Sequence, residues 1–162
     1  MDPNVTIHIL SDHDVPMMRQ MLHLFGEAFE DRETYGRQQP GDAYLQKLLA
    51  SDTYVAVAAL EHGAVIGGLA GYVLHKFEQE RSEFYIYDLA VAQHARRRGV
   101  ATAMIRSLQR TAAERGISVI FVQADHGDDP AIALYTKLGI REEVLHFDIA
   151  PAAVIRSTKK NS

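Results

Sequence analysis

A basic, glycine-containing turn in the middle of the chain has residue types suited to binding an anion. The turn and the start of the helical pattern after it comprise Arg96, Arg97, Arg98, Gly99, Val100, Ala101 and Thr102. Free backbone N–H groups at a helix N-terminus attract phosphate, and the helix dipole favours its charge. Small residues at Gly99 and Ala101 let the backbone approach closely. This basic turn (residues 96–102) therefore predicts a diphosphate site; a solvated arginine cluster is the alternative.

Two carboxylates lie in the apolar run just before the basic turn. Residues 83–91 are rich in tyrosine, isoleucine, leucine and valine, which predicts a central strand. Glu83 stands at its start and Asp88 in its middle, where a carboxylate is unusual. Asp88 is the first candidate for a proton acceptor because it lies near the basic turn, and Glu83 is the second. A buried, hydrogen-bonded structural aspartate is the alternative for Asp88.

Other acidic residues gather in two segments that could face a cation. The six between residues 121 and 150 are Asp125, Asp128, Asp129, Glu142, Glu143 and Asp148. Glu27, Glu30 and Asp31 follow a helical pattern, where the helix dipole does not favour anions. These carboxylates are either ligands for a cation or solvated charges.

Hydrophobic periodicity predicts ten elements that would position these residues. Strands are expected at residues 5–10, 53–60, 64–74, 83–91, 117–124 and 140–149, and helices after Pro16, from Asp42, and at 100–114 and 130–138. The segment at 117–124 is apolar enough for a buried strand. The order β-α-α-β-β-β-α-β-α-β indicates an α/β (α+β) fold. The polar tail, residues 150–162, is expected to be frayed.

Composition limits the class of protein. A chain of 162 residues with 47% hydrophobic and 23% charged residues predicts one globular domain, 1–162. The absence of cysteine excludes a thiolate nucleophile, and the eight scattered histidines predict no metal site. The net charge of -4 argues against a nucleic-acid partner. With no apolar run near about 20 residues and no signal-peptide pattern, a cytoplasmic protein without membrane contact is expected.

Two motifs resemble those of the GNAT N-acetyltransferase superfamily. Leu89-x-Val91 followed by Arg96-x-x-Gly99-x-Ala101 is similar to its acetyl-CoA loop. Residues 128–140 resemble its later signature, Asn-x-x-Ala-x-x-Leu-Tyr-x-Lys-x-Gly-Phe, with Asp128 in place of Asn and Ile140 in place of Phe. The resemblance implies a GNAT fold with a mixed central β-sheet flanked by helices, acetyl-CoA as co-substrate, and a homodimer. It also implies that the backbone of Leu89, Ala90 and Val91 helps to bind the cofactor.

A closer resemblance concerns the acceptor. Residues 76–79, 81–83, 85–91, 122–125, 127–130, 133–144 and 146–149 look like aminoglycoside 3-N-acetyltransferases of the gentamicin-modifying type. Aminoglycosides are polycations, so their ammonium groups need carboxylate partners. The substrate-binding residues predicted on this basis are Asp31, Asp88, Asp125, Asp128, Asp129, Glu142 and Asp148.

The resemblance also implies direct acetyl transfer without an acyl-enzyme. Amines with a pKa near about 10.4 are protonated at neutral pH, so Asp88, or else Glu83, would accept a proton directly or through water. A backbone N–H near residues 89–91 would polarise the thioester carbonyl, as in the family. Tyr135 in the later signature would protonate the departing thiolate. The alternatives are a polyamine or other small-amine acetyltransferase, a non-catalytic acyl-CoA-binding regulator and, least favoured, a structural or nucleic-acid module.

Overall fold

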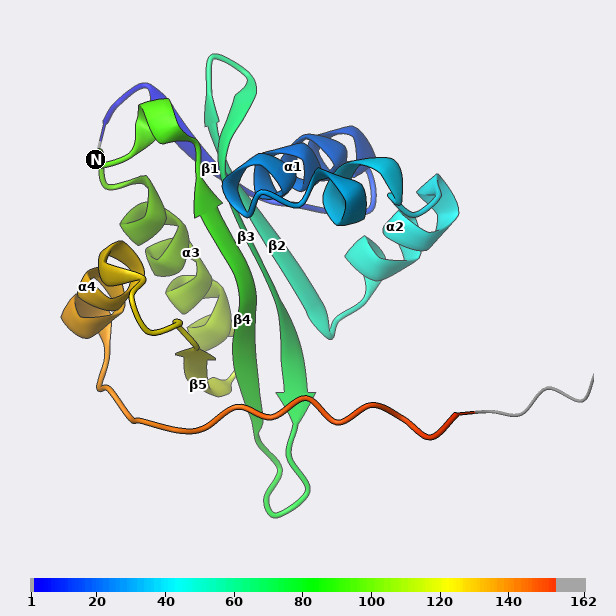
Figure 1. The fold of residues 1–162 in the computed structure, drawn as a ribbon, viewed down its shortest axis with the longest axis vertical. Helices are drawn as coiled ribbons and strands as arrows, with labels where there is room; N and C mark the ends of the chain where they lie inside the picture. Colours follow the sequence, from blue (N-terminus) through cyan, green and yellow to red (C-terminus); the bar gives the residue numbers. More distant parts are fainter. Residues whose placement is uncertain (1, 154–162) are drawn as a thin grey trace, which may run out of the picture.

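A five-stranded mixed sheet forms the centre of the molecule (Figure 1). The computed structural model describes residues 2–153. The strands stand in chain order: β1 (Val5–Ile9), β2 (Tyr54–Glu61), β3 (Ala64–His75), β4 (Ser82–Val91) and β5 (Ile117–Val122). The first four pair antiparallel, and β5 pairs parallel to β4. This arrangement confirms the mixed sheet, and β2 and β3 form an antiparallel hairpin.

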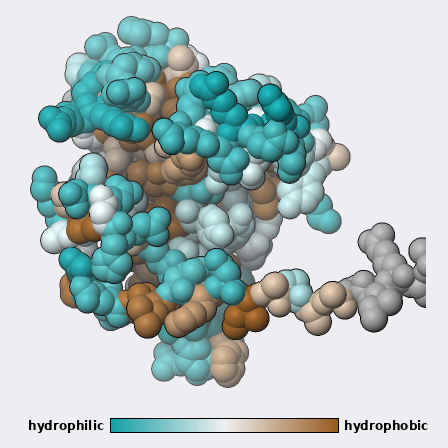
Figure 2. Space-filling view, viewed as in Figure 1, coloured by the Kyte–Doolittle hydropathy of each residue, from teal (hydrophilic) through white to brown (hydrophobic). Residues whose placement is uncertain are grey.

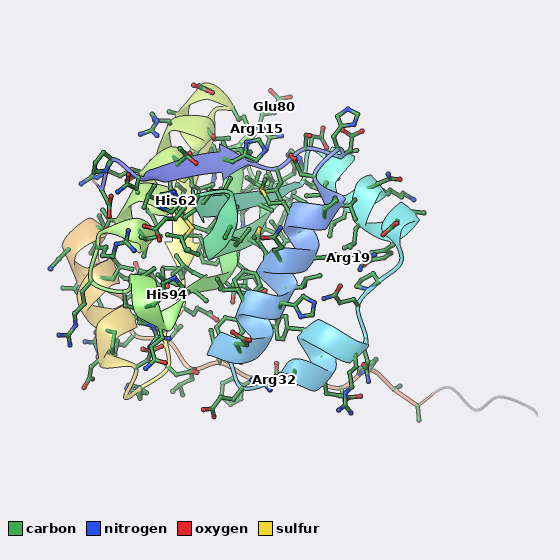
Figure 3. All side chains as sticks on the ribbon, turned by 90° about the horizontal axis from the view of Figure 1, so that it is seen from above. Arg19, Arg32, His62, Glu80, His94 and Arg115 are labelled. Atoms are coloured by element: carbon green, nitrogen blue, oxygen red, sulfur yellow. The ribbon has the colours of Figure 1, made fainter. Side chains whose placement is uncertain are left out.

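Helices cover both faces of the sheet (Figures 1 and 3). They are α1 (Val15–Ala28), a π-helical turn η1 (Glu33–Arg37), α2 (Asp42–Ala50), a 3-10 turn η2 (Gln93–Ala95), α3 (Val100–Glu114) and α4 (Asp129–Leu138). Helices α1 and α2 lie on one face, whereas α3 and α4 lie on the other. None of the described helices is long and apolar enough to cross a bilayer.

Alternation along the strands divides the apolar core into two halves. On β2, Val55 and Val57 pack with Met104 and Leu108 of α3, whereas Ala56 belongs to the cluster built on α1 and α2. Successive side chains of a strand point to opposite faces, so one sheet serves both helical layers. The two faces are called here the α1 face and the α3 face.

A β-bulge interrupts this alternation in β4. Ala70 of β3 pairs with Asp88, but the next residue, Gly71, pairs with Ile86, so Tyr87 is an extra residue on β4. Ile86 belongs to the core on the α3 face, and without the extra residue Asp88 would point the same way. The bulge instead turns Asp88 toward the α1 face.

The predicted strand at residues 140–149 is wrong. The described chain after α4, residues 139–153, has no regular structure, and every residue in it is exposed. This C-terminal arm runs away from the body and carries apolar side chains along its length (Figure 2). A β-pattern needs a neighbouring strand for its backbone hydrogen bonds, and within residues 2–153 the arm has none. Of the tail predicted to be frayed, residues 154–162 lie outside the described part.

The expectation of a buried strand at 117–124 is also corrected. β5 ends at Val122 and forms an edge of the sheet, so one side of its backbone has no partner strand among residues 2–153. Val119 is 44% exposed. An apolar run does not distinguish a central strand from an edge strand that is covered mainly on one face.

Candidate active site

Asp88 lies on the α1 face and is held by a tyrosine from a distant segment. The hydroxyl of Tyr35 donates a hydrogen bond to Oδ1 of Asp88 over 3.1 Å. Tyr35 belongs to η1, and its ring contacts Phe25 and Phe29 of the α1 segment at centroid distances of 6.1 and 5.6 Å. Packing of the Tyr35 ring against these two phenylalanines thus orients its hydroxyl, and the hydroxyl in turn orients the Asp88 carboxylate.

The surroundings of Asp88 favour a proton acceptor. Burial raises the pKa of the Asp88 carboxyl above its ordinary value, and the hydrogen bond from Tyr35 lowers it in part. Burial together with the nearby charge of Asp88 raises the pKa of Tyr35 to about 12. Tyr35 therefore stays protonated and donates, while Asp88 becomes a stronger base than an exposed aspartate.

The basic turn has the backbone geometry of an anion site. Gly99 is the N-cap of α3 in the left-handed conformation, with φ 77°, and no side chain caps this end of the helix. The first helical hydrogen bond runs from the Ala103 amide to the Gly99 carbonyl over 3.0 Å. The amides of residues 100–102 precede this bond and remain outside the helical ladder, as an anion site at a helix N-terminus requires.

The three arginines of the basic turn are not equivalent. Arg98 donates to Asp2 over 2.6 Å and also to Glu61, and these hydrogen bonds raise its pKa. Its guanidinium therefore anchors the turn to β2 and the N-terminal segment. Arg96 is exposed and donates to the Val91 carbonyl over 3.3 Å. Arg97 adopts a positive φ of 61°, which a non-glycine residue rarely does.

The edge of β4 next to this turn lies beyond the parallel ladder. The β4–β5 register runs from Ser82↔Ile117 to Ile86↔Val122 and stops there. Leu89, Ala90 and Val91 pair with β3 on their other side, through Leu69, Gly68 and Gly67. Within the described residues, the β5 side of this backbone stretch carries no ladder partner, which suits the predicted N–H donor to a carbonyl.

Tyr135 lies on α4 and is partly buried against the core on the α3 face. The side chain of Asp128 caps this helix by accepting a hydrogen bond from the Ala131 amide over 3.4 Å. Burial and the charge of Asp128 raise the pKa of Tyr135. A phenol in this state stays protonated at neutral pH, as a proton donor must.

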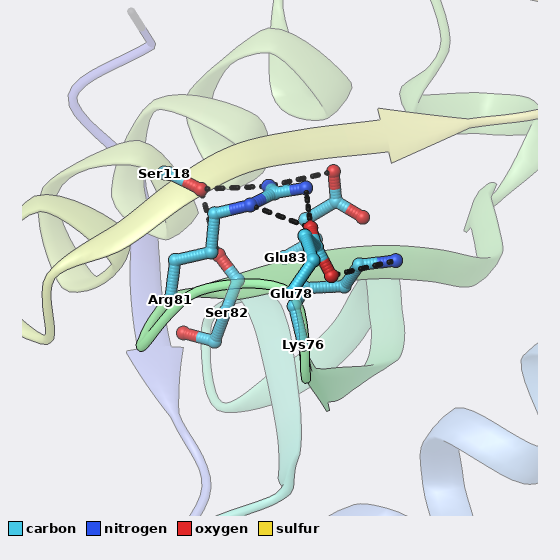
Figure 4. Close-up of polar contacts among 6 residues, drawn as sticks. All are labelled: Lys76, Glu78, Arg81, Ser82, Glu83 and Ser118. Carbon is cyan, nitrogen blue, oxygen red and sulfur yellow. Dashed lines mark hydrogen bonds and ion pairs between the residues drawn. The ribbon is translucent and has the colours of Figure 1, made fainter.

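Glu83, the second candidate base, is not brought together with Asp88. Glu83 and Asp88 are five positions apart on β4, and five positions along a strand span roughly 16 Å. Glu83 instead accepts from Arg81 over 3.1 Å, and Arg81 also binds Glu78 and Ser118 (Figure 4). This cluster joins the β3–β4 connection to β5 and gives Glu83 an ion-pair partner away from Asp88.

The carboxylates predicted to bind substrate are dispersed. Asp31 accepts from the Thr34 amide over 3.1 Å, and its charge acts on Tyr35, so it lies near Asp88. Asp128 is a helix cap, whereas Asp125 and Asp129 are exposed beside the same helix. Glu142 and Asp148 stand on the exposed arm, where Asp148 pairs with His146 over 3.0 Å.

Two residues important for the site had no signal in the sequence. Tyr35 lies in a segment between two predicted helices, and no local pattern marks it as a partner of Asp88. Gly71 permits the bulge: a Cβ there would lie 2.2 Å from the Tyr85 carbonyl oxygen. The sequence shows only a glycine inside a strand, which ordinary close packing explains equally well.

Two surface hollows lie away from Asp88 and Tyr135. One of about 490 Å³ lies beside α1 and η1 and includes Arg32, which is labelled in Figure 3, but not Asp88. No group of three or more histidine or acidic side chains suited to a metal ion occurs among residues 2–153.

Residues 18–140 match the Acetyltransferase (GNAT) family, so the chain belongs to this family and is an N-acetyltransferase. One curated relative is the [ribosomal protein bS18]-alanine N-acetyltransferase of Salmonella typhimurium, 25% identical over 91% of this chain and 88% of the relative.

Among solved structures, an aminoglycoside acetyltransferase from an uncultured soil metagenomic sample is 58% identical. The match has a TM-score of 0.89 and covers 91% of this chain and 99% of that one. A second aminoglycoside acetyltransferase from such a sample was solved in complex with sisomicin and is 32% identical. That match has a TM-score of 0.86 and covers 93% of this chain and 99% of the other. The chain is thus a GNAT N-acetyltransferase that resembles aminoglycoside acetyltransferases.

Proposed function

We propose that this enzyme transfers the acetyl group of acetyl-CoA to the 3-amino group of an aminoglycoside. The observation that carries the proposal is the half-buried Asp88, held by Tyr35 on a strand that runs toward an anion-binding helix N-terminus. The 58% identity to an aminoglycoside acetyltransferase supports the acceptor class. The position of the acetylated amine follows from the more detailed resemblance of the sequence.

The proposed cofactor site combines charge and backbone donors. The free amides of residues 100–102, with Arg96 and Arg97 nearby, would hold the diphosphate of acetyl-CoA. The unpaired edge at residues 89–91 would donate to the thioester carbonyl. Bound in this way, the cofactor supplies an activated acetyl group.

Proton transfer assigns roles to two side chains. Asp88 takes a proton from the ammonium group, directly or through water, and the neutral nitrogen attacks the carbonyl carbon. As the C–N bond forms and the C–S bond breaks, the Tyr135 phenol gives its proton to the thiolate. Asp88 passes this first proton to solvent, the nitrogen then loses its second proton through Asp88, and one proton from solvent restores Tyr135, so one proton is released per amide formed.

The direct test is an acetylation assay with a panel of amines, namely gentamicin, sisomicin, spermidine and a peptide that begins with alanine. We expect acetylated gentamicin or sisomicin and free coenzyme A, with mass spectrometry placing the acetyl group on the 3-amine. Raised resistance of bacteria that express the chain would agree with this. Activity confined to spermidine or the peptide would reject the aminoglycoside acceptor, and no turnover would favour a regulator.

The assigned roles are tested by Asp88→Asn and Tyr135→Phe. Loss of a proton-transfer group lowers kcat by about 100-fold or more. Full turnover in either variant would reject the role of that residue, whatever the acceptor.

We also propose a homodimer, and its support lies in the C-terminal arm. Leu145, Phe147 and Ile149 alternate with His146 and Asp148, and the three apolar side chains are 76–90% exposed. Such an amphipathic extended segment suits pairing with the open edge of β5 in a second copy. The cytoplasmic location stays a prediction.

A further inference from the structure

Five aromatic rings form a continuous row across four strands beside Asp88. The aromatic row consists of Tyr54 on β2, Tyr72 on β3, Tyr87 and Tyr85 on β4, and Phe121 on β5. Neighbouring ring centroids are 5.5, 6.0, 5.4 and 4.7 Å apart. The row lies on the α1 face, because Tyr54 packs in the core of that face.

The two ends and the middle of the row differ in exposure. Tyr54 is buried, and the Tyr85 hydroxyl donates to Gln123 over 2.8 Å. Tyr72 and Tyr87, in the middle, are 41% and 63% exposed. Their hydroxyls have no hydrogen-bond partner within residues 2–153. Cross-strand packing accounts for an aromatic row, but it does not require two adjacent rings to face solvent.

These exposed rings adjoin the proposed base. Tyr87 precedes Asp88 in the bulge, and both point to the α1 face. Burial raises the pKa of Tyr72, and the charge of Asp88 adds to the increase, so Tyr72 lies within the field of that carboxylate. A cation bound over these rings would therefore lie next to the group that receives its proton.

We infer that Tyr72 and Tyr87 bind an amine-bearing ring of the acceptor through their exposed faces and so position its amine at Asp88. This inference rests on the proposed function and names acceptor-binding side chains that differ from the predicted carboxylates. An ammonium group over a tyrosine face gains cation–π attraction, and the apolar face of a sugar ring covers the aromatic surface. The Asp88 carboxylate alone would attract any amine, whereas two aromatic rings favour a cyclic amine.

The experiment compares Tyr72→Leu and Tyr87→Leu with Tyr72→Phe and Tyr87→Phe, which keep the ring. Phe77→Leu is the matched control, because Phe77 is 99% exposed in the β3–β4 connection and outside the row. KM is measured for sisomicin and for acetyl-CoA, and sisomicin binding is measured by calorimetry. Each leucine change should raise the sisomicin KM and Kd by about 2- to 5-fold. The acetyl-CoA KM, and all values for the phenylalanine variants and Phe77→Leu, should stay within about 2-fold.

The outcomes separate this inference from the proposed function. Unchanged sisomicin Kd and KM in both leucine variants would overturn the inference and leave the enzyme an aminoglycoside acetyltransferase. Binding without turnover, weakened by the leucine changes, would overturn the proposed function alone. A wild-type chain that neither binds nor acetylates sisomicin would overturn both.

Discussion

At the residue scale, Asp88 is defined by what surrounds it rather than by its own type. A carboxylate with a raised pKa is a competent base only where a hydrogen bond holds it toward the acceptor, and Tyr35 supplies that bond. Because Tyr35 lowers the pKa that burial raises, the same tyrosine sets both the orientation and the working pH range of Asp88.

Tyr35→Phe is therefore expected to change the pH profile. In the proposed mechanism activity requires ionised Asp88, so kcat/KM should fall as pH drops through its pKa. Removing the Tyr35 hydroxyl removes the interaction that lowers the pKa of Asp88. The low-pH decline of kcat/KM, called the acid limb of the profile, should therefore move to higher pH. The profile is measured from pH 4 to about 9. Tyr44→Phe, which removes an exposed hydroxyl from α2, should leave the limb in place. A limb that stays or moves to lower pH in Tyr35→Phe would contradict this role.

Asp88→Asn is expected to separate stability from activity. A carboxyl whose pKa is raised by folding favours the folded state most at low pH, and that advantage is lost as pH rises from its unfolded pKa through its folded pKa. Above this pH window Asp88 is charged and its burial lowers the free energy of unfolding, whereas asparagine is neutral and has no such effect. Asp88→Asn should thus be at least as stable as the wild type near neutral pH in urea unfolding. Marked destabilisation there would indicate a structural aspartate.

At the element scale, the bulge in β4 decides which face of the sheet carries Asp88, the proposed base. An extra residue in one strand reverses the facing of every residue after it. Gly71 makes the bulge possible, because the Tyr85 carbonyl and the Phe84 ring occupy the place of a Cβ.

Gly71→Ala should therefore lower both stability and activity. A Cβ 2.2 Å from a backbone oxygen forces the strands apart, at a cost of about 1–3 kcal/mol. Thermal unfolding should show a Tm lower by several degrees, and kcat/KM should fall because Asp88 follows the bulge. Gly36→Ala has no atom within 4 Å of the new Cβ and serves as control. Equal Tm values for the two variants would mean that the bulge accommodates a side chain.

Two arginines of the basic turn have different predicted roles: Arg98 anchors the turn to the fold, and Arg96 helps to bind acetyl-CoA. Arg98→Ala leaves Asp2 and Glu61 without their cation, so it should lower Tm and raise the acetyl-CoA KM. Arg96→Ala removes an exposed charge and one hydrogen bond to the Val91 carbonyl, and it should raise that KM by about 2- to 5-fold with little change in Tm. Thermal unfolding and initial rates test both. A Tm loss in Arg96→Ala that equals the loss in Arg98→Ala would refute the division of roles.

At the scale of the whole molecule, the C-terminal arm distinguishes the isolated chain from an assembly. Its exposed apolar residues are a surface that a soluble monomer usually covers. Two chains of 18.1 kDa would give a particle of 2 × 18.1 = 36.2 kDa.

Light scattering after size exclusion should find this dimer for the wild type. The double variant Leu145→Glu and Phe147→Glu should be monomeric, because charged side chains cannot be buried against a partner without cost. Leu74→Glu on β3, where the side chain is 40% exposed, is a matched control that should stay dimeric. A monomeric wild type would reject the homodimer, and a dimeric double variant would exclude the arm as the interface.

The sequence by itself determined the order of the described strands and α-helices, the helix boundaries at 100–114, and the basic turn, because helical periodicity, caps and glycines act over a few residues. The short turns η1 and η2 were not predicted. Only the tertiary structure decided that Tyr35 meets Asp88, that Glu83 and Arg98 are held in ion pairs, and that Asp128 caps a helix. Those contacts join segments far apart in the chain or depend on a bulge, and neither leaves a local pattern. The arm shows the converse: Leu145, Phe147 and Ile149 have the alternation of a strand, but a strand forms only where a neighbour supplies its hydrogen bonds.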